Sequence, residues 1–515
     1  MAKGKRPGAA RGKGRRAPLK RSRRMSRRQA LALFATGGAV AAGTALAVKM
    51  DLVRSLTALL GGNRPKRPSF PRAASTGVVR AYTFEAAPVK IELGGQPIAT
   101  WAYNGMLPGP EIRLTEGDTL RVTVKNRLPE GTTIHWHGVP LVNSMDGVPG
   151  VTQQPILPGQ DFVYTFVAPA AGTYLYHSHA GLQLDRGLYG PLIIEPKRET
   201  LNYDNDFVVV FDDWLDGMPG TPEDAMKQLI KKGDSMGSMM GMGGMGASQV
   251  PPDILYPLYL INGRSSENPL ELMVRQGQKF RVRFINASAS TIYRVALQGH
   301  RMTVTHTDGQ PVEPVEVDAI RIGMGERYDV LVSANNPGVW QLAAQVEGTM
   351  RMARAIMRYK GSLAPLPPAT YQPPELTRRL LLYSMLKAAP GIFVPPGSDP
   401  DQVIPLKLSG GMGQYVWKIN DQVFDKADPV MVGGQSLIRF QFDSQSMMPH
   451  PMHLHGHFFQ VDNGTGRGPL KDTVLVDPRQ RLTINWVSDN PGAWAFHCHN
   501  RYHENAGMMR VVKVQ

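Results

Sequence analysis

Histidines separated by a single residue are the feature of this sequence best suited to chemistry. The chain has 515 residues and 13 histidines, among which five His-x-His pairs occur: His135/His137, His177/His179, His453/His455, His455/His457 and His497/His499. Random placement would give fewer than one such pair. Because side chains i and i+2 of a strand point to the same face, each pair aims two imidazoles in one direction. The sequence therefore predicts a cluster of imidazoles that holds several metal ions.

The only cysteine, Cys498, stands between His497 and His499. A lone cysteine is most often a buried apolar filler. Here the alternation of a strand would turn its thiol away from the two imidazoles, toward a separate metal ion. Three further residues with metal-binding side chains lie near it in sequence or are left over from the pairs: His450, His503 and Met508. Two His, one Cys and a weak axial Met are the ligands of blue copper. Zinc is the alternative, but zinc sites rarely use Met, so the residues favour copper.

Four segments carry a family resemblance. "HWHG", "YHSH", "HPMHLHGH" and "HCHNRYHENAGM" resemble the copper-binding motifs of the multicopper oxidases, which include laccases, cuprous oxidases and copper-resistance oxidases. The resemblance covers nearly all of the chain after the N-terminal segment. Residues 144–153 and 188–196 look most like the bacterial copper-resistance protein A branch. The resemblance implies three tandem cupredoxin-like Greek-key domains and an oxidase that couples one-electron oxidation of a reductant to four-electron reduction of O2 to water.

The resemblance also implies four copper ions and their ligands. The type 1 copper would be held by His450, Cys498, His503 and Met508. The type 2 copper would be held by His135 and His453. The type 3 pair would be held by His137, His177, His179, His455, His497 and His499. Electrons would enter at the type 1 site and pass through Cys498 to the neighbouring histidines.

Two acidic residues stand where the family places its proton-supplying carboxylates. They are Asp146, nine residues after His137, and Glu504, next to His503. Carboxylates at these positions suit general acid catalysis during water formation. For Asp146 the alternative is a purely turn-forming role in "DGVPG". The remaining histidines, His300, His306 and His457, are interpreted as structural.

The elements that must position these residues are strands. Runs of alternating apolar and polar residues, closed by Gly, Pro, Asn or Asp, predict strands at 119–128, 161–168, 206–214, 279–288, 327–334 and 437–443. Long amphipathic helical patterns are few, and 222–232 is a short candidate. A Gly-polar-strand-Asn pattern recurs at 114–138, 274–300 and 432–456. Together these patterns predict an all-β chain of three related sandwiches.

Breaks in composition suggest the domain boundaries. The first domain is expected at 76–198, with cluster ligands, and the second at 199–363, without cluster copper. A Pro-rich linker at 364–371 precedes a third domain at 372–515, which carries the type 1 ligands and further cluster ligands. The segment 235–246 has five Met and five Gly in twelve residues and is expected to form a loop. Its thioethers suit Cu(I), although low-complexity filler is the alternative.

The net charge of +16 is concentrated at the N-terminus. Residues 1–28 contain 13 Lys and Arg and no acidic residue, which leaves about +3 for the rest. A nearly balanced body gives no electrostatic reason to expect nucleic-acid binding. Arg27 and Arg28 precede an Ala/Gly-rich apolar run that ends near Ala47, which predicts a twin-arginine signal at 1–47 and a linker at 48–75. The twin-arginine (Tat) export machinery would then deliver a periplasmic or secreted protein with no stable membrane insertion; an uncleaved anchor is the alternative.

Three functions remain open from the sequence. The first is an exported oxidase of Cu(I) in copper tolerance, favoured by the Met-rich segment and by Met447, Met448 and Met452 around His450. The second is a laccase that oxidises phenols or aromatic amines. The third is a non-catalytic copper-binding or storage protein, which would have no need of a thiolate between two sites.

Overall fold

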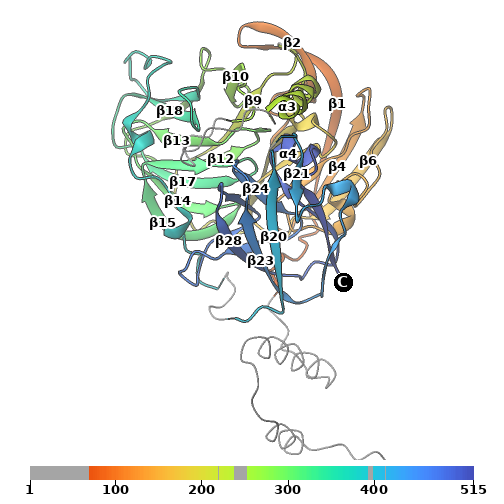
Figure 1. Cartoon of the computed structure of the whole chain (residues 1–515). Coiled ribbons are helices and arrows are strands. Elements are labelled where there is room, and N and C mark those ends of the chain that lie inside the picture. Colours follow the sequence, from red (N-terminus) through yellow and green to blue (C-terminus); the bar gives the residue numbers. More distant parts are fainter. Residues whose placement is uncertain (1–68, 219, 237–251, 392–397, 412) are drawn as a thin grey trace, which may run out of the picture. The chain divides into compact units, whose positions relative to one another are not determined.

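The computed structural model describes residues 69–218, 220–236, 252–391, 398–411 and 413–515 (Figure 1). The chain divides into two compact units, residues 1–65 and 66–515, and every described residue belongs to the second. The predicted signal at 1–47, most of the predicted linker at 48–75 and most of the Met-rich segment 235–246 lie outside the described residues. None of the described helices is both long and apolar enough to span a membrane.

The first sandwich packs two four-stranded sheets, with strand orders β2-β1-β4-β6 and β3-β8-β7-β5. Its elements are β1 Val79–Leu93, β2 Gln96–Tyr103, β3 Ile112–Thr115, β4 Thr119–Asn126, β5 His135–His137, η1 Asn143–Met145, β6 Asp161–Val167, β7 Gly172–His177, η2 Gln183–Arg186 and β8 Tyr189–Glu195. Trp136 is buried in the core between the sheets, against Tyr164 and Phe166. Because side chains alternate along β5, this turns His135 and His137 to the other side.

The second sandwich packs a six-stranded sheet on a five-stranded one. Its sheets have the orders β10-β9-β12-β17-β14-β15 and β11-β19-β18-β13-β16. Its elements are β9 Asn205–Trp214, α3 Pro222–Met236, β10 Leu258–Ile261, β11 Leu270–Val274, β12 Lys279–Asn286, β13 Tyr293–Leu297, β14 Met302–Thr307, β15 Gln310–Val317, β16 Ala319–Ile322, β17 Arg327–Ser333, β18 Val339–Val346 and β19 Met352–Tyr359.

The third sandwich has sheets of order β21-β20-β23-β28-β25-β26 and β22-β30-β29-β24-β27. Its elements, with the turns that lead into it, are η4 Pro374–Thr377, η5 Tyr383–Met385, β20 Gln402–Gly410, β21 Trp417–Ile419, η6 Phe424–Lys426, β22 Val430–Val432, β23 Leu437–Ser444, β24 His450–Leu454, β25 Phe459–Val461, β26 Leu470–Lys471, β27 Thr473–Val476, β28 Arg481–Val487, β29 Gly492–Cys498, α4 Arg501–Asn505 and β30 Met509–Val514.

The repeat predicted from the sequence corresponds to one recurring strand arrangement. The strands β4, β12 and β23 lie within the three repeated segments, and each has a parallel neighbour on one side, β1, β9 and β20 respectively. On the other side each has an antiparallel neighbour, β6, β17 and β28. In β4, Leu120, Val122 and Val124 are buried while the residues between them are more exposed, as period-2 alternation requires. The six strands predicted from such runs are all confirmed, with ends shifted by at most two residues.

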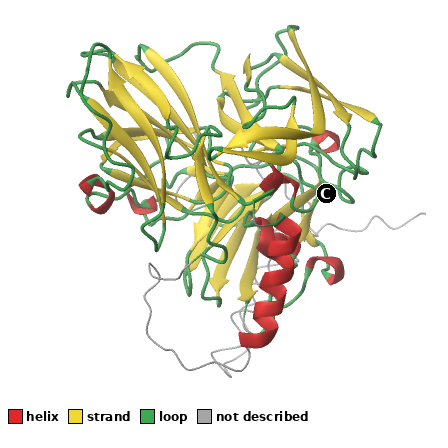
Figure 2. Ribbon diagram, turned by 90° about the horizontal axis from the view of Figure 1, so that it is seen from above, coloured by secondary structure: helices red, strands yellow, loops and turns green. Residues whose placement is uncertain are grey.

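The predicted helix at 222–232 is confirmed as α3, the one long helix among the described residues (Figure 2). Its first turn is closed by a capping box, in which the Asp224 N–H donates to Thr221 Oγ1 and the Thr221 N–H donates to Asp224 Oδ2. Pro222 fits the first helical position because its missing N–H would have no partner there. Leu229 is buried against the apolar core of the third sandwich, so α3 attaches the second sandwich to the third.

Candidate metal centres

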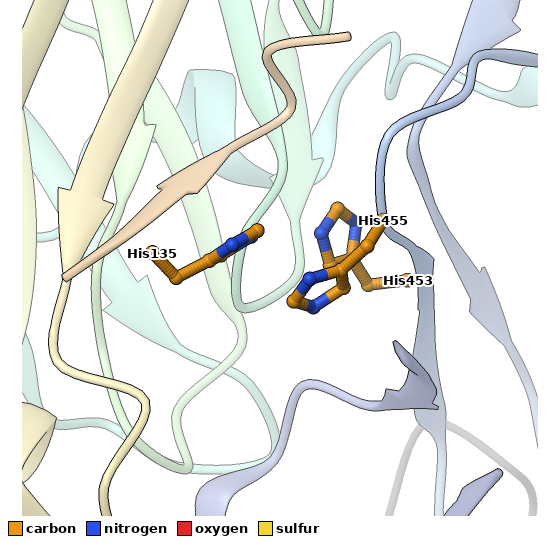
Figure 3. A group of neighbouring side chains, drawn as sticks. All are labelled: His135, His453 and His455. Carbon is orange, nitrogen blue, oxygen red and sulfur yellow. The ribbon is translucent and has the colours of Figure 1, made fainter. Parts of the chain in front are cut away.

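Strand pairing brings the histidine motifs together. His135 of β5 is opposite His177 of β7 in the first sandwich, and His453 of β24 is opposite His497 of β29 in the third. The two sandwiches then meet ring to ring. His135 stacks on His455 and His137 stacks on His453, each with ring centroids 3.8 Å apart. Figure 3 shows His135 facing His453 and His455 across this junction.

Eight imidazoles therefore converge in one buried cluster, and none is more than 6% exposed: His135, His137, His177, His179, His453, His455, His497 and His499. The Nε2 atom of His497 lies 3.0 Å from that of His455 and 3.4 Å from that of His179. The Nε2 atoms of His177 and His499 are 3.3 Å apart. Ring nitrogens facing one another at such distances are the arrangement of ligands around shared cations.

Backbone carbonyls fix the tautomer of four of these rings. His135 donates from Nδ1 to Asp146 O at 2.8 Å, and His453 donates in the same way to Asp472 O at 2.8 Å. His177 and His497 donate from Nδ1 to the carbonyls of Ser178 and Cys498, at 2.9 and 3.0 Å. An Nδ1–H leaves the Nε2 lone pair free to bind metal.

Several nitrogens of the cluster have no hydrogen-bond partner among the described residues. They are His135 Nε2, His137 Nδ1, His453 Nε2 and His499 Nδ1. Buried polar atoms normally have partners, and cations would satisfy these. Burial, together with the neighbouring imidazoles, lowers the pKa of His177, His455 and His499 well below the usual 6.5. These rings are neutral at pH 7, which is the form that binds a metal ion. The cluster therefore fits the copper ions that the sequence predicts.

A second donor set lies on the other side of Cys498. The Cys498 Sγ is 3.6 Å from His450 Nδ1 and 3.6 Å from His503 Nδ1, and the two Nδ1 atoms are 3.2 Å apart. A point equidistant from these three atoms lies about 2 Å from each, which is the length of a metal–ligand bond. Met508 is fully buried in the apolar core of the third sandwich, which also contains Cys498. The Met508 carbonyl accepts from the Cys498 N–H at 3.0 Å.

The outer nitrogens of the two histidines have acceptors. His450 Nε2 lies 2.6 Å from Ser446 Oγ, whose own hydrogen is donated to a carbonyl. His503 Nε2 donates to Asp253 Oδ2 at 2.7 Å. His450 and His503 therefore turn Nδ1 toward Cys498 and use Nε2 for the outer hydrogen bond. The four cluster rings described above do the reverse, with Nδ1 hydrogen-bonded and Nε2 free for metal. Burial raises the pKa of the Cys498 thiol, so a bound cation is needed to stabilise the thiolate. This donor set also fits copper, held by a softer ligand than any in the cluster.

Both predicted carboxylates contact cluster imidazoles. Asp146 Oδ2 is 3.0 Å from His455 Nδ1, and its side chain is 1% exposed. Glu504 Oε2 is 3.1 Å from His497 Nδ1, and its Oε1 is 3.6 Å from His179 Nδ1. Burial raises the pKa of Asp146, which the nearby His135 partly offsets. Glu504 also lines a cavity of about 860 Å³ that reaches His179.

Three residues of the site were missed by the sequence analysis: Asp253, Asp472 and Arg501. Asp253 contacts His503, Asp472 contacts His137 and His453, and Arg501 pairs with Glu504. Asp253 and Asp472 lie in segments without a metal-binding motif, so no local signal marked them. Arg501 stands inside "HCHNRYHENAGM", where a basic residue three positions before a glutamate on one helical turn is a recognisable signal.

The three histidines interpreted as structural belong to none of the candidate metal groups among the described residues. His300 has partners for both ring nitrogens, Gln298 O at 2.9 Å and the Tyr359 hydroxyl at 2.8 Å. His457 Nδ1 is 3.1 Å from His455 O, and His306 Nδ1 is 3.1 Å from Thr305 Oγ1. Among the described residues, no candidate metal group includes a side chain of the second sandwich.

Comparisons with known proteins agree with this picture. Three family models, each described as multicopper oxidase, match residues 85–199, 205–362 and 398–515 respectively. Multicopper oxidase MmcO of Mycobacterium tuberculosis is 39% identical over 500 residues, which cover 94% of this chain and 96% of that protein. Copper resistance protein A of Escherichia coli is 29% identical over 576 residues, with 87% and 94% covered. The crystal structure of the laccase from Botrytis aclada has a TM-score of 0.72 at 26% identity, with 86% and 88% covered.

The fold and the two donor sets define a copper-dependent oxidoreductase of cupredoxin-like architecture. The chain belongs to the multicopper oxidase family. The predictions of the family, of the all-β cupredoxin-like fold and of oxidase chemistry are confirmed. Four copper ions are the standard complement of this family, and its members use O2 and a reductant.

Proposed function

We propose that the protein is an exported oxidase that uses O2 to oxidise Cu(I) in copper tolerance. In this proposal His450, Cys498, His503 and Met508 hold the type 1 copper, His135 and His453 hold the type 2 copper, and the six other cluster histidines hold the type 3 pair. When bound, the copper ions supply electron transfer and the reduction of O2 to water. The chain supplies the ligands, the path through Cys498 and His497, and the carboxylates that move protons.

The observation that carries the choice of Cu(I) is the environment of His503. Asp253 accepts from His503 Nε2, on the side of the ring away from Cys498, and its side chain is 11% exposed. Burial alone would raise the pKa of Asp253, but the nearby His503 outweighs it and lowers the pKa, so the carboxylate is ionised. Asp253 follows the Met-rich segment 235–246 closely in sequence. An anion that contacts a type 1 ligand, with a thioether-rich segment a few residues before it in sequence, suits a soft monovalent cation. The likeness to copper resistance protein A supports the same choice.

A laccase is the second candidate, and relatives support it too. Laccase-2 of Cryptococcus neoformans is 30% identical over 517 residues, covering 85% of this chain. The storage protein considered from the sequence is not favoured, because the family consists of oxidoreductases.

Deleting residues 235–246 should distinguish the two candidate oxidases. O2 uptake is measured on copper-loaded protein with Cu(I) or a dimethoxyphenol as the sole reductant. We expect the intact protein to prefer Cu(I), and the deletion to lower the rate with Cu(I) by about tenfold, the scale on which outer groups affect a metal site. The rate with the phenol should stay unchanged.

A variant of full length with the five methionines of 235–246 replaced by leucine is the matched control for the deletion. It should reproduce the loss, since it removes the thioethers and keeps the length. Equal losses with both reductants would contradict a role in gathering Cu(I), and a strong preference of the intact protein for the phenol would make it a laccase.

Substituting Asp253 with asparagine tests the electron-entry side directly. Asparagine keeps the size of the side chain and removes its charge. We expect kcat/KM for Cu(I) to fall by about 10-fold or more, with the blue absorption retained. Asp425→Asn, which removes a carboxylate from the wall of the 860 Å³ cavity, is the control and should leave Cu(I) oxidation unchanged. Equal rates for the Asp253 and Asp425 variants would remove Asp253 from substrate binding.

We also propose that residues 1–47 are a twin-arginine signal cleaved near Ala47 and that the mature protein is periplasmic or secreted. The basic segment, Arg27, Arg28 and the short apolar run support this. The intact mass of the exported protein tests the cleavage, because a mass that begins at Met1 would identify an uncleaved anchor.

A further inference from the structure

Asp472 is a third carboxylate that contacts the cluster, at rings that Glu504 does not contact. It lies between β26 and β27 of the third sandwich, and its side chain is 1% exposed. Its Oδ1 is 3.2 Å from His137 Nε2 and 3.5 Å from His453 Nδ1, and its carbonyl accepts from His453 Nδ1. One aspartate thus contacts a cluster ring of the first sandwich and a cluster ring of the third. Its carboxylate contacts the His137 ring, and its carbonyl holds the His453 ring.

Arg327 of the second sandwich holds that carboxylate with two parallel hydrogen bonds. Its Nη1 donates to Asp472 Oδ1 at 2.7 Å and its Nη2 donates to Asp472 Oδ2 at 2.6 Å. Its Nε donates to Thr173 O of the first sandwich at 3.0 Å, and the side chain is fully buried. The guanidinium therefore joins all three sandwiches at one point. The planar fork of arginine matches a carboxylate in a way that no other cation can.

The backbone on both sides of this pair is glycine because no side chain would fit. Gly138 directly follows His137, and a Cβ there would lie 2.4 Å from Arg327 Nη2 and from Asp472 Oδ2. A Cβ on Gly325 would lie 2.8 Å from His137 Cε1. Both glycines have positive φ, +83° and +82°, which L side chains rarely adopt. The Arg327–Asp472 ion pair therefore packs directly against the backbone of the "HWHG" segment.

A second set of charges holds the same loop. Asp308 Oδ2 accepts from the backbone N–H groups of Asp472 and Thr473, at 3.2 and 3.1 Å. Lys471 Nζ lies 3.1 Å from Asp308 Oδ2 and 3.0 Å from Glu326 Oε1. These groups balance the charge of the buried network, so removing one partner leaves an uncompensated charge. Asp308 holds the backbone of Asp472 while Arg327 holds its side chain.

We propose that Arg327 is a positioning residue for the copper cluster: it fixes Asp472, and Asp472 fixes His453 and His137. The second sandwich, whose described side chains join no candidate metal group, thus determines whether the type 2 position is filled. This inference rests on the proposed assignment of His453 to the type 2 copper. Thr473 Oγ1 adds to the arrangement, since it donates to Asp472 Oδ1 at 2.8 Å. The effect passes through the orientation of two rings and does not require Arg327 to touch a substrate.

The test is the copper content and the electron paramagnetic resonance spectrum of Arg327→Lys. Lysine keeps the positive charge and loses the fork, so Asp472 is held by one contact in place of two. We expect the type 1 signal and the blue absorption to remain. The type 2 signal should be lost or reduced, and copper per chain should fall from four toward three, which corresponds to about a 10–100-fold loss of affinity at that position.

Arg283→Lys is the matched control. Arg283 is another buried arginine of the second sandwich, which pairs with Asp206 and also donates to Thr173. We expect Arg283→Lys to keep all copper signals.

Asp472→Asn, which keeps the shape of the side chain, should reproduce the selective type 2 loss. This variant decides the question if Arg327→Lys does not fold. Full copper with an unchanged type 2 signal in Arg327→Lys or Asp472→Asn would overturn the inference. So would equal losses of all copper signals in the Arg327 and Arg283 variants. Absence of the type 1 and type 2 signals from the unmodified protein would instead reject the proposed function.

Discussion

Replacing Cys498 with serine is expected to remove the blue absorption and the O2-dependent turnover together. The Sγ atom is the only sulfur among the three donors that lie 3.2–3.6 Å apart, and serine cannot supply a soft anionic ligand there. The same residue joins the two donor sets, because the Cys498 carbonyl accepts from His497 Nδ1. Loss of a residue that only hydrogen-bonds a metal ligand typically lowers activity about 10–100-fold. Loss of the ligand Cys498 itself should lower turnover by far more. Absorption spectroscopy and O2 uptake measure the two effects.

A neighbouring substitution separates this effect from packing. Met452 is paired with Cys498 across β24 and β29 and is fully buried. Exchange of methionine for leucine conserves volume and is usually tolerated in a core. Met452→Leu should therefore keep the colour and most of the turnover. A blue, active Cys498→Ser protein would overturn the assignment of Cys498 to the type 1 site.

The parts of the fold that follow from period-2 alternation could be predicted from the sequence. The strand β4, for example, buries every second residue, and its pattern was readable without any partner strand. The same reasoning explains why His135 and His137 share a face while Trp136 enters the core. Strand alternation does not explain the positions of His455, which follows the end of β24, and His179, which lies two residues beyond β7. Loops bring these two rings to the cluster, so the His-x-His spacing alone could not predict their positions.

Contacts between distant segments could not be predicted in this way. Arg327 and Asp472 are separated by 145 residues, and their pairing depends on how the second and third sandwiches dock. Asp253 and His503 are separated by 250 residues. A buried arginine at the start of a strand looks locally like any charged residue at a strand end. The metal ligands can be identified from residue type and spacing in the sequence. The groups that orient them can be identified only from the tertiary structure, in which the sandwiches pack together.

The second large effect is expected from Glu504→Gln, which should slow the reduction of O2 and leave the blue absorption intact. Glu504 stands between the 860 Å³ cavity and two cluster rings, His497 and His179. Burial alone would raise its pKa, but the Arg501 guanidinium and His497 outweigh burial and lower the pKa. The carboxylate is therefore ionised near neutral pH, ready to take a proton from water in the cavity and pass it toward the cluster. Glutamine keeps the size and cannot carry a proton.

Turnover of the Glu504→Gln variant should fall by about 10²-fold or more, the usual contribution of a positioned acid or base. Stopped-flow reoxidation of the fully reduced protein measures the step, and the blue absorption is followed in the same samples. Glu504→Asp is the matched control, because it retains a carboxylate at a slightly greater distance and should recover part of the rate. Because the carboxylate is lost, the contribution of this group to the pH dependence of reoxidation should vanish in Glu504→Gln and persist in Glu504→Asp. Unchanged reoxidation in the glutamine variant would exclude Glu504 from proton delivery. Asp146, which contacts His455, would then be the carboxylate to test next.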